Sequence, residues 1–84
     1  MKPEQIYNEL RDLSEKMGVT VREQNFRSTG VKAKSGFCIL KGERFFIIDK
    51  HKKLNDKNEI LVDFLRTQSH EDIFVVPAIR DLLA

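Results

Sequence analysis

Apolar residues follow a helical period near the start of the chain. They recur every three or four positions, at Ile6, Leu10, Leu13 and Met17. This spacing places them on one face of an α-helix, as in a helix that packs on a core. Pro3 suits the first turn of a helix, and Gly18 suits the left-handed residue that ends one. The pattern predicts an N-terminal helix between these two residues.

A different period follows, in which side chains alternate between two faces. Residues 19–24 place Val19, Val21 and Glu23 on one face and Thr20, Arg22 and Gln24 on the other. A two-residue period is typical of a β-strand, and the more polar face indicates that the strand is half-buried. We predict a strand at the edge of a sheet.

Two apolar runs surround a turn in the middle of the chain. Residues 37–40 and 45–48 are entirely apolar and lie on either side of Lys41-Gly42. Glycine at the second position of a two-residue loop is typical of a type I′ β-hairpin. We predict a hairpin in which Cys38 lies opposite Phe45.

The remaining apolar residues predict a second helix, with a buried stripe at Ile60, Leu61, Phe64 and Leu65. We expect it to begin near Lys57, with Asn55 or Asp56 as its cap, and to end at residues 67–69. Residues 73–76 form a further apolar run. Pro77 biases the residue before it away from helical geometry, so this run is expected to be extended, with a short helix after it.

These elements predict an α+β fold. It has an N-terminal helix, a small antiparallel sheet of two or three strands with a central hairpin, a second helix and a short C-terminal helix. We expect residues 1–84 to form a single domain, because a chain of this length buries roughly 60 to 65 % of its unfolded surface. The longest apolar runs have four residues, against about 20 in a membrane span. We therefore expect no membrane association.

Charge is unevenly distributed along the chain. Residues 27–57 carry nine Lys and Arg against three Asp and Glu, whereas residues 1–26 carry four against five and residues 58–84 two against five. A basic middle suits an anionic macromolecule such as nucleic acid, which cations bind through its phosphates. The candidate contacts are Lys32, Lys34, Lys41, Arg44, Lys50, Lys52 and Lys53. The alternative is a solvated basic face, since the nearby phenylalanines lie within apolar runs rather than on an exposed platform.

A nucleophilic site is the enzymatic hypothesis, because Cys38 is the only cysteine and His51 and Asp49 follow it. The predicted hairpin separates these residues. Asp49 lies four residues and His51 six residues beyond the partner of Cys38, about 13 and 20 Å at the rise of a strand. We expect Cys38 to be buried and unreactive, and Asp49 to accept backbone N–H groups at the end of its strand.

No motif indicates a metal or a cofactor. His70, Glu71 and Asp72 are consecutive, so on a helix they point in different directions and do not form a zinc site. The four glycines are scattered rather than gathered in a phosphate-binding loop. The second predicted helix has no histidine, which excludes the metallopeptidase motif H-E-x-x-H.

Both faces of the predicted hairpin are apolar. Phe37, Ile39, Phe46 and Ile48 share one face, and Cys38, Leu40, Phe45 and Ile47 share the other. The first two helices can cover one face, so either the C-terminal segment or a second copy of the chain covers the other. A homodimer that buries hairpin surface is therefore a candidate assembly.

Short patterns in the sequence resemble a family of short, uncharacterised bacterial proteins that has no assigned activity or cofactor. They are Gly36-x-Cys38, Gly42-x-Arg44, Ile48-Asp49 and Phe74-x-x-Pro77-x-x-Arg80. A lone cysteine and an N-terminus without a basic and apolar leader favour a reducing, cytoplasmic setting. We expect a non-enzymatic domain that binds a macromolecule or itself. Its alternatives are a nucleic-acid-binding module that uses residues 27–57 and a small enzyme that uses Cys38 or Asp49.

Overall fold

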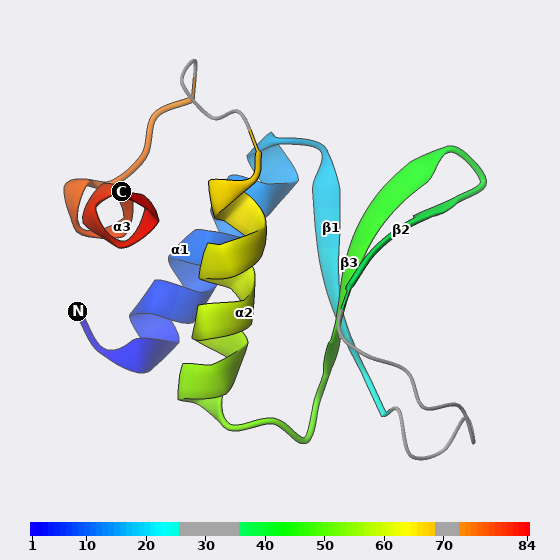
Figure 1. Ribbon diagram of the computed structural model, residues 1–84, viewed down its shortest axis with the longest axis horizontal. Helices are drawn as coiled ribbons and strands as arrows, with labels where there is room; N and C mark the ends of the chain where they lie inside the picture. The colour runs from blue at the N-terminus through cyan, green and yellow to red at the C-terminus, as the bar shows by residue number, and fades with distance from the viewer. Residues whose placement is uncertain (26–35, 69–72) are drawn as a thin grey trace.

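The computed structural model describes residues 1–25, 36–68 and 73–84, and their elements form an α+β fold (Figure 1). In chain order these elements are α1 (Pro3–Lys16), β1 (Val19–Gln24), β2 (Gly36–Leu40), β3 (Glu43–Asp49), α2 (Leu54–Arg66) and α3 (Pro77–Leu83). The fold class predicted from the sequence is confirmed. None of the described helices is both long and apolar enough to span a membrane.

The hairpin of β2 and β3 has the predicted register and turn. Cys38 lies opposite Phe45 in the antiparallel pair. Lys41 and Gly42 both have positive φ angles, of 52° and 81°. Two successive left-handed residues define a type I′ turn, whose twist matches that of the strands it joins. The turn therefore fixes which side chains of β2 lie on each face of the sheet.

The sheet is mixed, which corrects the prediction of an antiparallel sheet. Its strand order is β1-β3-β2, and β1 runs parallel to β3. The alternation of apolar residues shows which side chains are buried, but it does not show which strands are neighbours. Because β2 reverses the chain and β3 reverses it again, β1 and β3 point the same way, and their adjacency makes the pair parallel. The prediction that β1 lies at an edge is confirmed.

The start of α2 also differs from the prediction. The helix begins at Leu54, and Lys53 occupies the N-cap position without a side-chain hydrogen bond. Neither Asn55 nor Asp56 acts as the cap. Leu54 is partly buried against the core, so packing of this side chain extends the helix beyond the start that capping residues indicated. The end of the helix, with Thr67 at the C-cap, agrees with the prediction.

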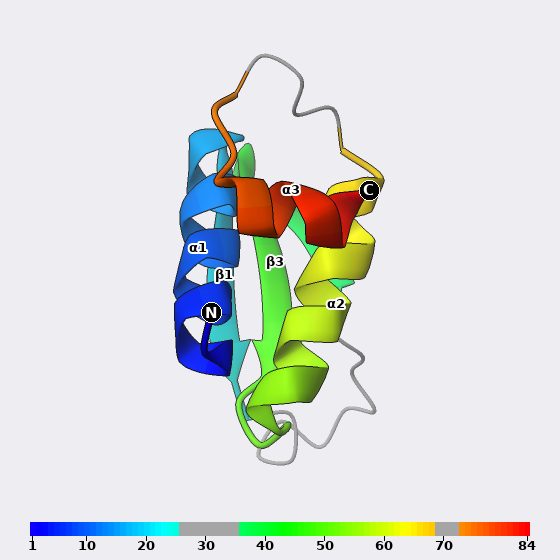
Figure 2. The same ribbon diagram turned by 90° about the vertical axis from the view of Figure 1, so that its left-hand side faces the viewer.

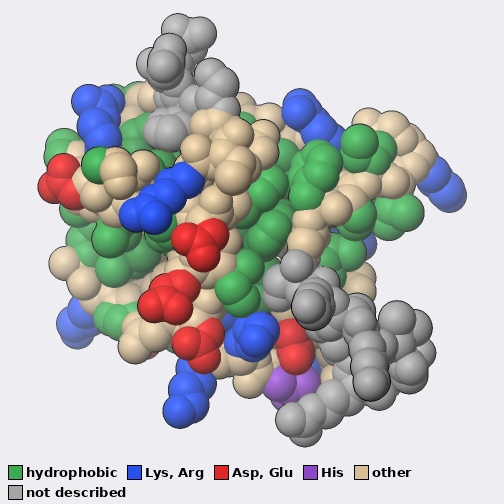
Figure 3. All heavy atoms as spheres, viewed as in Figure 1, with side chains coloured by type: hydrophobic (Ala, Val, Ile, Leu, Met, Phe, Trp, Pro, Cys, Tyr) green, Lys and Arg blue, Asp and Glu red, His purple; other side chains and the backbone are tan. Residues whose placement is uncertain are grey.

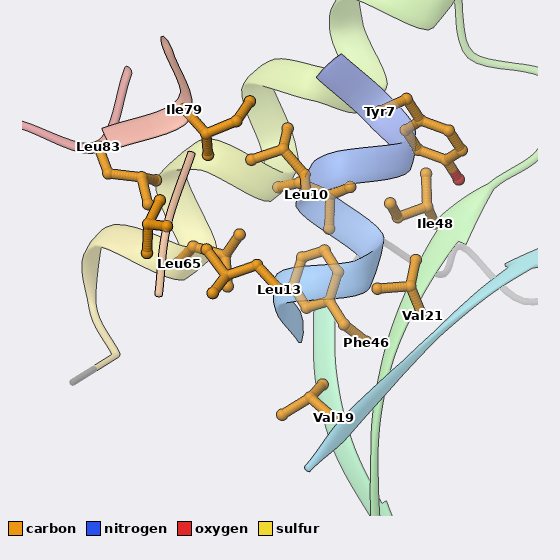
Figure 4. Packing of buried hydrophobic residues seen from close by; sticks show 12 residues of the cluster. Tyr7, Leu10, Leu13, Val19, Val21, Phe46, Ile48, Leu65, Ile79 and Leu83 are labelled. Atoms are coloured by element: carbon orange, nitrogen blue, oxygen red, sulfur yellow. The ribbon is translucent and has the colours of Figure 1, made fainter. Parts of the chain in front are cut away.

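The helices α1, α2 and α3 of the described residues lie on one side of the sheet (Figures 1 and 2). Helices α1 and α2 cover the sheet, and α3 crosses them on the side away from the strands. Figure 4 shows the side chains that fill the space between these layers. The core includes Leu10, Leu13, Val19, Val21, Phe46, Ile48, Leu61, Leu65, Ile79 and Leu83. The C-terminal segment therefore does not cover the other face of the sheet, which was one of two arrangements expected from the sequence.

Candidate binding surface

Strand β2 is the most exposed apolar element in the described part of the protein. Phe37, Ile39 and Leu40 are 45, 61 and 58 % exposed. Figure 3 shows hydrophobic side chains at the surface of this hairpin, on the right of the view. The strand order places β2 at an edge of the sheet, and its sequence GFCIL has no charged residue. An uncharged, apolar edge strand is a template for pairing with another strand.

The exposed side chains of β2 continue the hydrophobic core. Phe37 lies directly opposite Phe46 in the hairpin, so both project toward the helices. Phe64 of α2 stacks on both rings, with centroid distances of 5.8 Å to Phe37 and 4.3 Å to Phe46. Ile39, two residues after Phe37, projects to the same side but lies nearer the turn of the hairpin. The exposed apolar surface of β2 is therefore the edge of the hydrophobic core that the described helices leave uncovered.

The backbone of β2 has hydrogen-bonding groups directed away from β3. In a two-residue hairpin, the residues that flank the turn exchange both backbone hydrogen bonds, and bonded pairs then alternate with non-bonded pairs. Leu40 pairs with Glu43 at the turn. Phe37 and Ile39 therefore belong to non-bonded pairs, and their N–H and C=O groups point outward. These are the two residues whose apolar side chains lie on the helix-facing margin.

The opposite face of the sheet is only partly covered. Phe45 is 7 % exposed, and the Arg22 guanidinium lies 4.8 Å from its ring centroid. Cys38, opposite Phe45, has intermediate exposure. The prediction of a buried Cys38 is therefore wrong. The apolar neighbours of this residue suggested burial, but β2 is an edge strand and none of the described helices lies over this face.

The basic residues of the middle segment lie at two ends of the sheet. Lys41 and Arg44 are at the hairpin turn, where the Arg44 guanidinium donates to the Met17 carbonyl oxygen at 3.4 Å. Lys50, Lys52 and Lys53 follow the other end of β3. Strand β3 runs between the two groups, and Lys50 lies six residues after Arg44, about 20 Å at the rise of a strand. Lys32 and Lys34 lie outside the described residues, so the full predicted nucleic-acid surface is not assembled by the described residues alone.

A polar cluster joins β1 to both main helices. The Tyr7 hydroxyl donates to Glu23 Oε2 at 2.7 Å, and Lys57 Nζ donates to Glu23 Oε1 at 2.6 Å. Burial raises the pKa of Tyr7, and the neighbouring carboxylate adds to this shift. Burial opposes ionisation of Glu23, but hydrogen bonds from Lys57 and Tyr7 together outweigh it and lower the pKa of Glu23. Because its polar atoms are bonded to one another, this cluster is suited to holding elements together.

This cluster is the part of the molecule that sequence reasoning missed. Glu23 shares the alternation of Val19 and Val21, whose side chains are 2 and 3 % exposed on the helix side. Glu23 itself is exposed at the end of this face, where a carboxylate lies within reach of donors on the helices that cover the strand. That alternation could have indicated partners for Glu23 on the helices, although not Tyr7 and Lys57 in particular.

The described residues do not bring Cys38, Asp49 and His51 together. The register places Cys38 opposite Phe45, four residues before Asp49. Asp49 Oδ1 instead accepts the backbone N–H of His51 at 3.0 Å, which confirms its expected role at the end of the strand. No group of three His, Cys, Asp or Glu side chains placed to hold a metal ion occurs in residues 1–25, 36–68 and 73–84. His70, Glu71 and Asp72 lie outside these ranges.

Comparison with known proteins gives no match to a family model, a curated protein or a solved structure. The resemblance to short bacterial proteins therefore stays a prediction from the sequence patterns.

Proposed function

We propose that this protein is a non-enzymatic binding module that associates with a polypeptide through the edge of β2. The observation that carries the proposal is the coincidence, at Phe37 and Ile39, of outward backbone groups with exposed apolar side chains. Strand addition uses the same two elements, because main-chain hydrogen bonds contribute affinity and alternate side chains contribute specificity.

The other edge of the sheet is less suited to this association. Strand β1 carries Arg22 and Glu23, and charged residues on an edge strand discourage further pairing. The Glu23 carboxylate is already held by Tyr7 and Lys57. The proposal therefore assigns binding to one edge only.

A capped synthetic peptide tests this proposal. The probe carries the sequence of residues 36–40 with serine in place of the cysteine and a lysine at each end, and it is titrated in excess into isotope-labelled protein. We expect concentration-dependent shifts of the backbone amide resonances of Phe37 and Ile39, with slower hydrogen exchange at both. Unchanged resonances in β2 at millimolar peptide, or shifts concentrated in β1, would refute the proposal.

Ile39→Pro and Ile39→Val form a matched pair for this titration. Proline removes the outward N–H of residue 39 but no hydrogen bond of the hairpin, and it is tolerated at such positions of edge strands. Valine keeps the N–H and an apolar side chain. We expect roughly fivefold weaker peptide binding by the proline variant, since one hydrogen bond contributes about 1 kcal/mol and a tenfold change corresponds to about 1.4 kcal/mol. The valine variant should bind like the original protein.

Two other functions stay as alternatives to this proposal. Nucleic-acid binding through residues 27–57 would give association that weakens steeply with added salt, whereas strand addition to an uncharged edge would not. Catalysis by Cys38 or Asp49 would need partners for these side chains beyond those in the described residues. A bacterial, cytoplasmic setting stays a prediction from the sequence patterns and the lone cysteine.

A further inference from the structure

We infer that the strand received by β2 is β2 of a second copy of this chain, in an antiparallel pair whose twofold axis passes beside Cys38. This inference rests on the proposed function and specifies the partner of the same surface. The resulting dimer would have one continuous sheet, to which each copy contributes the three described strands, with the described helices on one side.

The backbone of β2 is self-complementary about Cys38. The outward-facing residues Phe37 and Ile39 are placed symmetrically on either side of it. In an antiparallel pair, Phe37 of one copy lies opposite Ile39 of the other, and these two residues exchange both of their backbone hydrogen bonds. The symmetry repeats this pair on the other side of Cys38. All outward groups of Phe37 and Ile39 in both strands are then satisfied without a change of register within either hairpin.

The side chains of β2 also fit this arrangement. On the helix-facing side, the exposed Phe37 and Ile39 of both copies would form one cluster, which Phe64 extends into each core. On the other side, the exposed Leu40 of one copy lies beside Gly36 of the other, where the absence of a side chain leaves room. The strand has no charge, so the pairing brings no like charges together.

The size of this interface predicts a weak dimer. A strand of five residues contributes the contact, which is smaller than the 20 to 30 residues a side that are typical of interfaces burying about 1,200–2,000 Å². Association should therefore depend on protein concentration. A second copy also explains why the edge lacks the charges that would suppress pairing between identical strands.

The register makes a specific prediction about the chain's only cysteine. Cys38 would face Cys38 of the second copy in a non-bonded pair, whose Cα atoms lie about 4.5 Å apart. This distance falls within the range that a disulfide bridges. Diamide, an azo oxidant, can therefore link the copies. The two thiols lose two protons and two electrons, the N=N bond of diamide accepts them to become a hydrazine, and one S–S bond forms.

Oxidation of the full-length chain tests the inference. We treat the protein with diamide at several concentrations and measure the covalent dimer by mass and on non-reducing gels, in parallel with sedimentation under reducing conditions. We expect rapid formation of a dimer of twice 9.8 kDa, with a yield that follows the non-covalent dimer seen by sedimentation. Cys38→Ser should still sediment as a dimer but form no covalent one.

Ile39→Lys distinguishes cross-linking within the specific dimer from cross-linking between molecules that collide at random. The variant keeps the thiol of Cys38 and introduces like charges at the proposed interface. We expect at least tenfold slower cross-linking and a monomer by sedimentation, with an unchanged circular dichroism spectrum. Equal cross-linking rates in both proteins, or a reduced dimer that oxidation does not link, would overturn the inference. A monomer that still binds the peptide at β2 would also overturn it, but would leave the proposed function standing.

Discussion

The two edges of the sheet differ in how they are joined to the rest of the molecule. Strand β1 places Val19 and Val21 in the core and connects Glu23 to Tyr7 of α1 and Lys57 of α2. Strand β2 is joined to the described helices mainly through Phe37 on Phe64. One edge is thus anchored by buried side chains and a charged hydrogen-bond network, while the other presents apolar side chains and backbone groups that no described strand pairs with.

In the sheet that the described residues form, one edge therefore contributes mainly to stability and the other is available for binding. Substitutions on the exposed margin of β2 should weaken association without unfolding the protein, because little surface is buried there. Substitutions near β1 should instead lower the stability of the protein without weakening association. Variants of both edges and of the hairpin turn test this division between stability and binding.

Ile48→Ala and Ile39→Ala compare two isoleucines that project from the same face of the sheet. Ile48 is 0 % exposed and Ile39 is 61 % exposed. We expect Ile48→Ala to lower the free energy of unfolding by about 2–5 kcal/mol, the range for a buried isoleucine, and Ile39→Ala to lower it by less than about 1 kcal/mol. Urea denaturation of the two variants measures both values, under reducing conditions and at low concentration. Equal losses would show that β2 is not a peripheral strand.

Tyr7→Phe tests the anchoring of β1. The variant removes the hydroxyl that donates to Glu23 and keeps the aromatic ring in the core. We expect a loss of about 1–2 kcal/mol, since the acceptor is charged and the contact is partly buried. Peptide binding at β2 should be unchanged. A binding defect as large as the stability defect would mean that the two edges are coupled.

Gly42→Ala tests the turn that presents β2. Gly42 has a φ of +81°, and open space surrounds it, so the expected cost is backbone strain rather than a clash. We expect a loss of about 1 kcal/mol for alanine. Gly42→Asn is the matched control, because asparagine adopts left-handed geometry more readily, and it should cost less than alanine. Equal losses from thermal melts would indicate that the turn is not of the type described.

The pH dependence of stability tests the charge state of Glu23. Its pKa in the folded protein is lowered from 4.5, so the unfolded chain takes up a proton first as the pH falls. The stabilising contribution is therefore present above about pH 4.5 and is lost as the pH falls through the lower folded-state pKa. The melting temperatures of the original protein and Glu23→Gln should differ most at neutral pH and converge in acid. A difference that grows in acid would contradict this assignment.

Local sequence patterns predicted the parts of the fold that depend on neighbouring residues. The apolar stripe that ends before Gly18 predicted α1, and Lys41-Gly42 predicted the hairpin and its register. Both predictions were possible because each depends on a period or a turn within a short segment. The parallel pairing of β1 with β3 was not predictable from these patterns, since it depends on which strands meet in space. The exposure of Cys38 was missed for the same reason, because the position of β2 in the sheet decides it.

Amide hydrogen exchange along β2 distinguishes a free edge strand from a paired one in a single experiment. At low protein concentration the hairpin should protect the amides of Cys38 and Leu40, which face β3, while those of Phe37 and Ile39 exchange rapidly. At high concentration all four should be protected, whereas β1 should show no change. Amides of Phe37 and Ile39 that stay unprotected at every concentration and with excess peptide would contradict the account, as would an equal change in β1.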